Sequence, residues 1–323
     1  AFGGANLSAT ISPDGEVALA GTARINGRLA DIAAHAASLS RIHDDGSPFD
    51  LAFSVPELAI QFNGRLATAH ILSLAGTGTL SAGNVHSAAQ WMGVTPERAA
   101  APLALVMSGA MEAAGQTFAM RHADIAIGTM SAKGNVSLDS RGEVPALQAD
   151  LAAILPAGGA TADGWGSDRL DLAGLTHTSF VLKLVTDQIE YGGLVSGPSR
   201  IAATGKDGRL DAELGITALA GGTGSITLGI DANQTPPQLA LGIKTVDGDS
   251  RQLLPALTGI GWLSGQVSLS AELAGTGDTQ QEIFGTLKGT AEITLTDGAV
   301  AGLAIPALLG EASQRVVEGW PGS

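Results

Sequence analysis

The chain has 323 residues, a formal net charge of −14, 45 glycines, no cysteine and only 4 % aromatic residues. Nucleic acid is excluded as a partner because the 17 lysine and arginine residues are scattered and form no basic stripe. The negative charge also argues against docking on anionic lipid headgroups. The absence of cysteine excludes a disulfide framework and a thiolate site, and no run of 18 apolar residues is present to span a membrane.

The first half of the chain is a series of short strands in which apolar and polar residues alternate with period two. Turns are predicted at Ser12-Pro13-Asp14-Gly15, Asn26-Gly27 and Asn63-Gly64. Residues 84–93 break the pattern, and short helices are expected at 87–92 and 96–101. The strands predicted in this half are 7–11, 17–25, 49–55, 58–62, 65–74, 76–82, 103–107, 117–121, 123–127 and 134–138.

Residues 155–168 carry no period and predict a boundary or a flexible loop. They divide the chain into an N-terminal β-rich region, 1–160, and a C-terminal β-rich region, 161–323. Helices are expected at 250–258, capped by Asp249 or Ser250, and at 306–319, where one apolar stripe is visible. The strands predicted in this half are 178–185, 189–191, 210–218, 224–231, 239–246, 265–273 and 287–298.

Together these patterns predict an all-β chain with a few short helices. Each strand has one apolar face, and the sequence holds too few helices and aromatic residues to cover such a long row of faces. Alternation alone predicts an ordinary two-layer sandwich equally well. A solenoid with a fixed sequence period is disfavoured because no strict short repeat is visible. The chain starts at Ala1 and stops in mid-pattern, so it is interpreted as a fragment whose C-terminal region is cut short.

The sequence offers no set of residues for catalysis or metal binding, so it predicts neither an enzyme nor a cofactor. The segment 193–197 has its serine one place too late for a nucleophile elbow, and 221–226 lacks the lysine of a phosphate loop, so both are interpreted as turns or bulges. His122 and Asp124 have same-face strand spacing and are interpreted as a solvated pair. The acidic pairs Asp44-Asp45 and Asp247/Asp249 are interpreted as solvated turns. The six histidines, none in a metal-binding motif, are His35, His43, His70, His86, His122 and His177.

The ordered elements from residue 210 to 305 resemble the C-terminal region of the AsmA-like family of Gram-negative envelope proteins. The resemblance includes Lys206-Asp-Gly-Arg-Leu, the Gly-Gly break before GSITLGID, and VDGDSRQLLPAL. Its most distinctive part is 265–309, where a strand ends in a glycine and is followed by the helical QQEIF. A Leu-x-Gly-x-Ala strand, Asp297-Gly298 and Gly302-Leu303 come next, the last leading into a helix.

The resemblance implies a periplasmic domain anchored to the inner membrane by an upstream helix that is not part of this sequence. Its fold is expected to be a long, curled, mostly antiparallel sheet with an apolar groove, shaped like a β-taco or an incomplete barrel. Roughly 18 strands would reach some 85 Å at ~4.8 Å per strand. The resemblance also implies a role in outer-membrane biogenesis and phospholipid movement.

The groove is expected to shield phospholipid acyl chains, which are the expected partner. The alternatives are an assembly or scaffolding factor for outer-membrane proteins, which would use sheet edges for strand addition, and a surface adhesin. The residues expected to line the groove are Leu210, Leu214, Ile216, Ile226, Leu228, Ile230, Leu239, Leu241, Ile243, Val267, Leu269, Leu273, Ile293 and Leu295.

Overall fold

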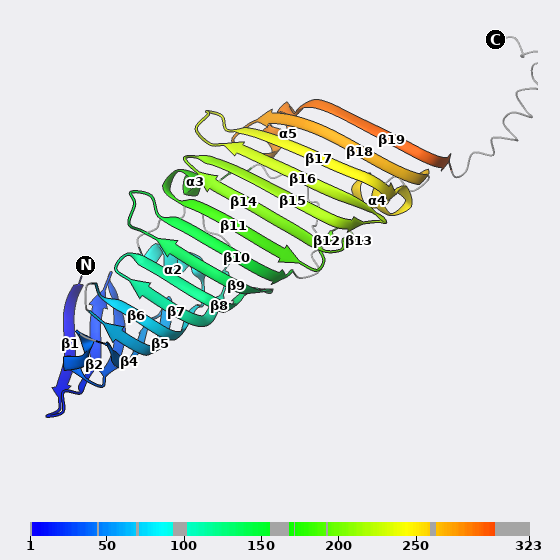
Figure 1. The fold of residues 1–323 in the computed structure, drawn as a ribbon. Helices are drawn as coiled ribbons and strands as arrows, with labels where there is room; N and C mark the ends of the chain where they lie inside the picture. The colour runs from blue at the N-terminus through cyan, green and yellow to red at the C-terminus, as the bar shows by residue number, and fades with distance from the viewer. Residues whose placement is uncertain are drawn as a thin grey trace, which may run out of the picture.

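The fold is dominated by one long, curved sheet with short helices beside it (Figure 1). It is taken from a computed structural model that describes residues 2–43, 45–68, 71–92, 102–155, 168–170, 172–191, 193–258 and 263–300. Strands make up 68 % of the structure and helices 11 %, so the expected all-β class is confirmed.

The N-terminal half contributes ten strands and two helices. In the parts of this half that the structure describes, the helices are α1 (Leu39–Ile42) and α2 (Val85–Met92). The strands are β1 (Phe2–Ile11), β2 (Val17–Ile25), β3 (Arg28–Ala36), β4 (Ser47–Val55), β5 (Leu58–Ala67), β6 (Ser73–Ala82), β7 (Leu105–Ala114), β8 (Thr117–Ile127), β9 (Met130–Asp139) and β10 (Ala146–Ile154).

The described part of the C-terminal half holds three helices, namely α3 (Ala173–His177), α4 (Ser250–Thr258) and α5 (Gln280–Thr286). A small hairpin, β12 (Glu190–Tyr191) and β13 (Leu194–Val195), forms a separate sheet. The strands that continue the main sheet are β11 (Ser179–Thr186), β14 (Ser199–Lys206), β15 (Arg209–Leu219), β16 (Gly222–Asp231), β17 (Gln238–Asp249), β18 (Leu263–Thr276) and β19 (Lys288–Val300).

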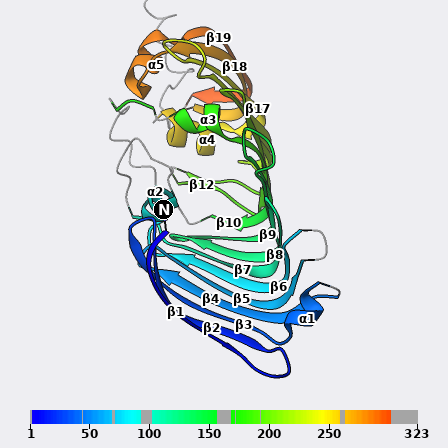
Figure 2. The same ribbon diagram turned by 90° about the vertical axis from the view of Figure 1, so that its left-hand side faces the viewer.

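In the 17-stranded sheet, each strand pairs with the strand of this sheet that follows it along the chain. Every pair is antiparallel except β10–β11, which is parallel. The sheet does not close into a barrel, as expected. Seventeen strands at ~4.8 Å spacing reach about 77 Å. Figure 2 shows the strands bowed, with α2, α3, α4 and α5 on the inner side of the curve.

The sheet has a more apolar face and a more polar face, because residues opposite each other in a register project to the same side. On β7 and β8, for example, Met111 lies opposite Met120, whereas the neighbouring Glu112 projects to the other face. The apolar face holds the main core of the N-terminal half, which is centred on Phe62, Met111, Met120, Ala123 and Ile125.

The structure corrects several details of the predicted strands. Asn63-Gly64 is not a turn but lies within β5, where the backbones of two strands come very close. A Cβ added to Gly64 would lie 2.6 Å from the Cα of Gly76. The sequence prediction also missed β3, β10 and β14, and 117–127 is one strand with a bulge rather than two strands.

The predicted boundary at 155–168 lies in the sequence between β10 and β11, which pair in parallel. A parallel pair needs a crossover connection, which explains why a long non-periodic segment occurs here. The main sheet continues from β10 into β11, so both regions contribute to one sheet. The division into 1–160 and 161–323 stays a prediction, and the helices expected at 96–101 and 306–319 lie outside the described residues.

Candidate functional site

The registers bring all fourteen residues predicted to line a groove to one face of strands β15 to β19. One row runs from Leu210 through Ile230 to Leu239, and a second runs from Leu228 through Leu241 to Leu273. The remaining rows are Leu214–Ile226–Ile243, Ile216 with Leu269 and Ile293, and Val267–Leu295. We call these fourteen residues the C-terminal apolar face.

Most side chains of the C-terminal apolar face are only half-buried. Val267 is the one fully buried member, with 3 % of its surface exposed, whereas Ile226 is 37 % and Ile293 65 % exposed. A face of large aliphatic side chains that stays half-exposed is unusual for a closed core.

Helix α4 covers this face at one end of the strands. Leu253 is 1 % exposed and packs in a cluster with Leu219, Ala220 and Val267. Asp249 caps the helix, because its Oδ1 accepts a hydrogen bond of 3.0 Å from the Arg251 N–H. The sequence offered Asp249 or Ser250 as this cap, and the structure selects Asp249.

Helix α5 covers the same face at the opposite end of the strands. Ile283 is 4 % exposed and lies over Gly275 of β18, where a Cβ would lie only 2.7 Å from the Ile283 carbonyl oxygen. Two hydrogen bonds start the helix: the N-cap Thr279 Oγ1 accepts from the Glu282 N–H at 3.0 Å, and Glu282 Oε2 accepts from the N–H of Asp278, the residue before the cap, at 2.8 Å. The predicted QQEIF helix is therefore confirmed.

The sequence prediction missed that the apolar face extends onto β14 and β11. Ile201 of β14 lies opposite both Leu214 and Leu184, and Leu182 lies opposite Ala203. The signal that could have found β14 is the alternation of Ile201, Ala203 and a glycine in an otherwise polar segment.

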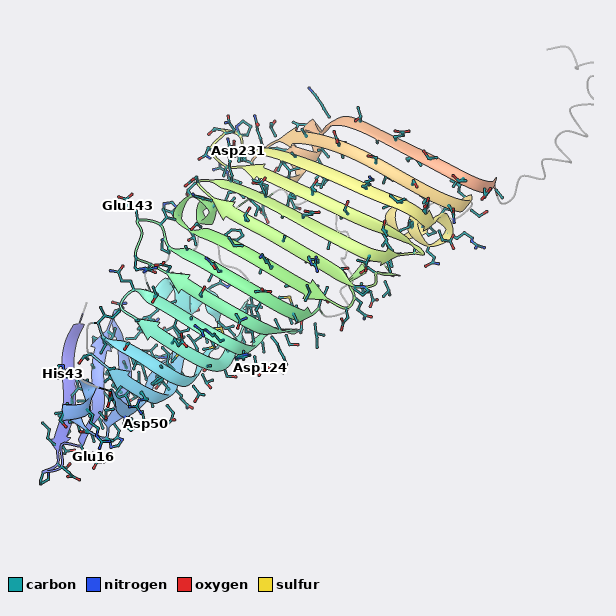
Figure 3. All side chains as sticks on the ribbon, in the orientation of Figure 1. Glu16, His43, Asp50, Asp124, Glu143 and Asp231 are labelled. Carbon is teal, nitrogen blue, oxygen red and sulfur yellow. The ribbon has the colours of Figure 1, made fainter. Side chains whose placement is uncertain are left out.

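The opposite, polar face carries the ionisable groups, and most of them are exposed. Asp124, labelled in Figure 3, forms an ion pair of 2.7 Å with Lys133, so the carboxylate is not paired with His122 as its spacing suggested. His122 lies at the bulge of β8 with φ 50°, and its N–H donates to Asn135. This face also bears a hollow of about 1180 Å³, lined by apolar side chains such as Val106 and Val185 and by charges of both signs that include Arg200 and Glu213.

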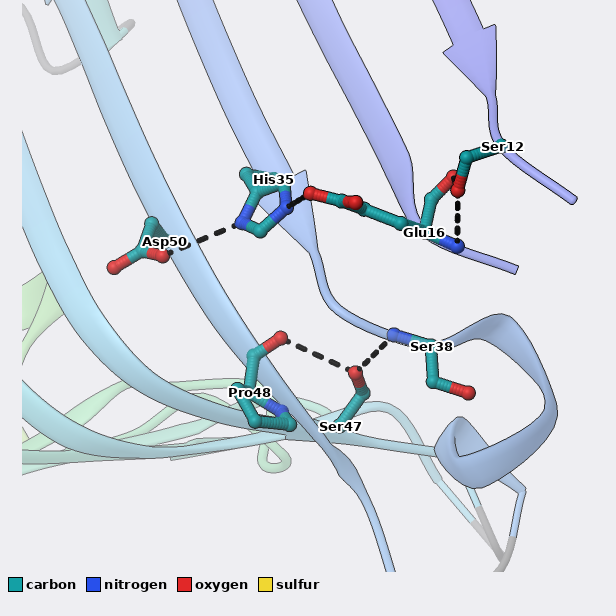
Figure 4. A network of polar contacts seen from close by, with 7 residues as sticks. All are labelled: Ser12, Glu16, His35, Ser38, Ser47, Pro48 and Asp50. Atoms are coloured by element: carbon teal, nitrogen blue, oxygen red, sulfur yellow. Dashed lines mark hydrogen bonds and ion pairs between the residues drawn. The ribbon is translucent and has the colours of Figure 1, made fainter. Parts of the chain in front are cut away.

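A second polar cluster lies on β3 and its neighbours (Figure 4). His35 Nε2 is 2.6 Å from Glu16 Oε1, and its Nδ1 is 3.6 Å from Asp50 Oδ2. The hydrogen bond with Glu16 raises the pKa of His35, and Asp50 adds to this effect. The groups are exposed and accompany no nucleophile, so the cluster is an ion-pair network on the sheet surface.

The remaining motifs have structural roles. Ser196, in the 193–197 segment, accepts a hydrogen bond of 2.9 Å from the Ile189 N–H. Ala220 and Gly221 form the turn between β15 and β16 with φ 49° and 87°, next to a register shift, so the predicted bulge is confirmed. In the described parts of the chain, no cluster of three or more His, Asp or Glu side chains could hold a metal ion.

Comparison with protein families finds a match for the C-terminal part of this sheet. The AsmA family model matches residues 182–316, which contain the C-terminal apolar face, α4 and α5. The match supports an AsmA-like family assignment, as the resemblance implied. Comparisons with the curated proteins and with the solved structures find no match.

The AsmA family match of residues 182–316 is consistent with a general role in outer-membrane biogenesis and lipid transport. The family is generally non-enzymatic and consists of membrane-associated periplasmic proteins. In the residues that the structure describes, no helix is both long and apolar enough to cross a membrane.

Proposed function

We propose that this chain is a non-catalytic periplasmic segment of an AsmA-family protein that shields phospholipid acyl chains as they move between the two membranes of the envelope. An inner-membrane helix upstream of this sequence would anchor it. The observation that carries the proposal is the C-terminal apolar face, whose large aliphatic side chains stay half-exposed between α4 and α5.

The energetics of lipid transfer explain why such a face suits this function. Exposing an acyl chain of ~16 carbons to water costs about 12 kcal/mol, at ~0.8 kcal/mol per methylene. A row of leucine and isoleucine side chains offsets this cost without recognising one position along the chain. The fourteen residues of the face carry no polar atom in their side chains, so together they supply an extended apolar surface.

A transfer assay between vesicles tests the proposal. Donor vesicles carry a fluorescent phospholipid at a self-quenching concentration, and acceptor vesicles carry none. We expect the full chain to raise the initial rate of transfer in proportion to its concentration. A rate equal to the spontaneous rate at all protein concentrations would overturn the proposal.

One observation favours a second function, the assembly of outer-membrane proteins. Strand β19 pairs with β18 along one edge, and no strand of the described chain pairs with its other edge. Free backbone donors and acceptors along such an edge can add a strand from another protein. Hydrogen–deuterium exchange of this chain, measured with and without an unfolded outer-membrane protein, tests this function. Strand addition would protect the β19 amides from exchange, whereas lipid binding alone would not.

A further inference from the structure

We infer that acyl chains bind only over strands β14 to β19, whereas the apolar face of β4 to β8 is filled by the protein's own side chains and carries no lipid. This inference rests on the proposed function and states which part of the sheet performs it. It divides one continuous apolar face into a filled half and a lipid-binding half.

The first observation is the burial of large side chains in the N-terminal half. Six large apolar residues of β4 to β8 are fully buried, each with less than 9 % of its surface exposed. They are Val55, Leu58, Phe62, Met111, Met120 and Ile125.

Glycines on the same face explain how these side chains fill the space. A Cβ added to Gly78 would lie 2.7 Å from Met111 Cε, and one added to Gly109 would lie 3.1 Å from Met120 Cγ. The long side chains therefore lie flat over the bare backbone of neighbouring strands. A lipid chain would have to displace them from this contact, at the cost of their packing.

Helix α2 closes the filled half further. Ala88 is buried against Ala30, Val55 and Leu58, and the Trp91 ring lies 6.1 Å from Phe53. The Trp91 indole N–H also donates to the Ile25 carbonyl at 3.1 Å, which ties the helix to the strand end.

Strands β14 to β19 have the opposite composition. None of these six strands contains an aromatic residue or a methionine, whereas β4 to β8 contain four phenylalanines and three methionines. The large apolar side chains of β14 to β19 that are fully buried are Leu219 and Val267, and both lie beneath Leu253 of α4. In the middle of these strands no large apolar side chain is fully buried. The face is built of shorter side chains that leave room above them.

The dimensions agree with one acyl chain lying across the strands. Six strands span about 24 Å at ~4.8 Å per neighbouring pair. An acyl chain in a bilayer occupies about 15 Å, half of the ~30 Å hydrocarbon core. The lipid-binding half is therefore long enough for a complete chain.

Single-cysteine labelling tests the inference, because the chain contains no cysteine of its own. Leu228→Cys and Leu241→Cys report on the lipid-binding half, and Met107→Cys and Phe118→Cys report on the filled half. All four positions are half-buried on the apolar face, so they are matched in exposure. Each full-length variant is labelled with bimane and incubated with vesicles of phosphatidylcholine whose acyl chains carry bromine, and lipid retained after vesicle removal is quantified.

We expect bromine to quench the label at least twofold at 228 and 241 and to leave 107 and 118 within 10–20 % of their intensity with ordinary lipid. Equal quenching in both halves, or quenching only at 107 and 118, would overturn the inference while the proposed function stands. Retention of no lipid by any variant or by the unlabelled chain would overturn the proposed function, and this inference with it. Circular dichroism melting of each variant confirms that the sheet has formed.

Discussion

Leu228 of β16 lies directly opposite Leu241 of β17, and both side chains are half-buried on the C-terminal apolar face. A cross-strand pair of leucines inside a closed core would be covered by a second layer. Here the described chain provides helices only at the two ends of these strands. Substitutions at this pair therefore distinguish a binding surface from a closed core, because the two roles predict different effects on lipid transfer and on stability.

Leu241→Glu tests this distinction. We expect the initial rate of phospholipid transfer to fall at least tenfold, because a carboxylate on the face must be desolvated when an acyl chain binds. Stability should fall by only about 1–3 kcal/mol, since the position is half-exposed already. The measurements are vesicle transfer and urea unfolding.

The matched control is Ala240→Glu, on the same strand but on the polar face, where the side chain is exposed. It should leave both transfer and unfolding within error of the parent chain. If Leu241→Glu loses enough stability to account for its loss of transfer, Leu241 is a core residue.

Alternation predicted the rows of the C-terminal apolar face, because each of the fourteen residues follows the period of a single strand. It could not predict which half of the sheet is filled. That depends on Met111 lying over Gly78 of a neighbouring strand, a contact that no local pattern contains. The prediction of a turn at Asn63-Gly64 was wrong for a related reason. A glycine is required at position 64 because the backbone comes very close to Gly76, and not because the chain turns there.

Ala212→Phe should make the lipid-binding half resemble the filled half, because it adds a large side chain to the apolar face. Ala212 lies opposite Leu228 on the apolar face and is half-buried, so a phenyl ring there would cover the leucine row. We expect lipid retained per protein to fall severalfold while the melting temperature stays level or rises, because the ring buries apolar area that lipid otherwise covers. Ala240→Phe on the polar face is the control, and equal loss of lipid in both variants would contradict the account.

Gly275→Ala should displace α5. The new methyl group would lie 2.7 Å from the Ile283 carbonyl oxygen, which belongs to the helix backbone and cannot rotate away. We expect a loss of about 1–3 kcal/mol in the free energy of unfolding and faster amide exchange in α5. At Gly215 a Cβ meets nothing within 4 Å, so Gly215→Ala should be neutral or slightly stabilising. Similar melting curves for the two variants would show that α5 does not rest on Gly275.

The His35 network should make stability depend on pH. Because the hydrogen bond with Glu16 raises the pKa of His35 in the folded state, its contribution is complete below the unfolded value of about 6.5 and is lost as pH rises through the folded pKa. NMR titration of the His35 ring should show the raised pKa, and Glu16→Gln should lower it. An unchanged titration in Glu16→Gln would assign the shift to another group.

The most direct test of the central claim is mass spectrometry of lipid extracted from the full chain after purification from bacteria without detergent. The account predicts phospholipid bound at a fixed ratio to protein, and its loss in Leu241→Glu but not in Ala240→Glu. A correctly folded chain that carries no phospholipid, and takes up none from vesicles, would contradict it.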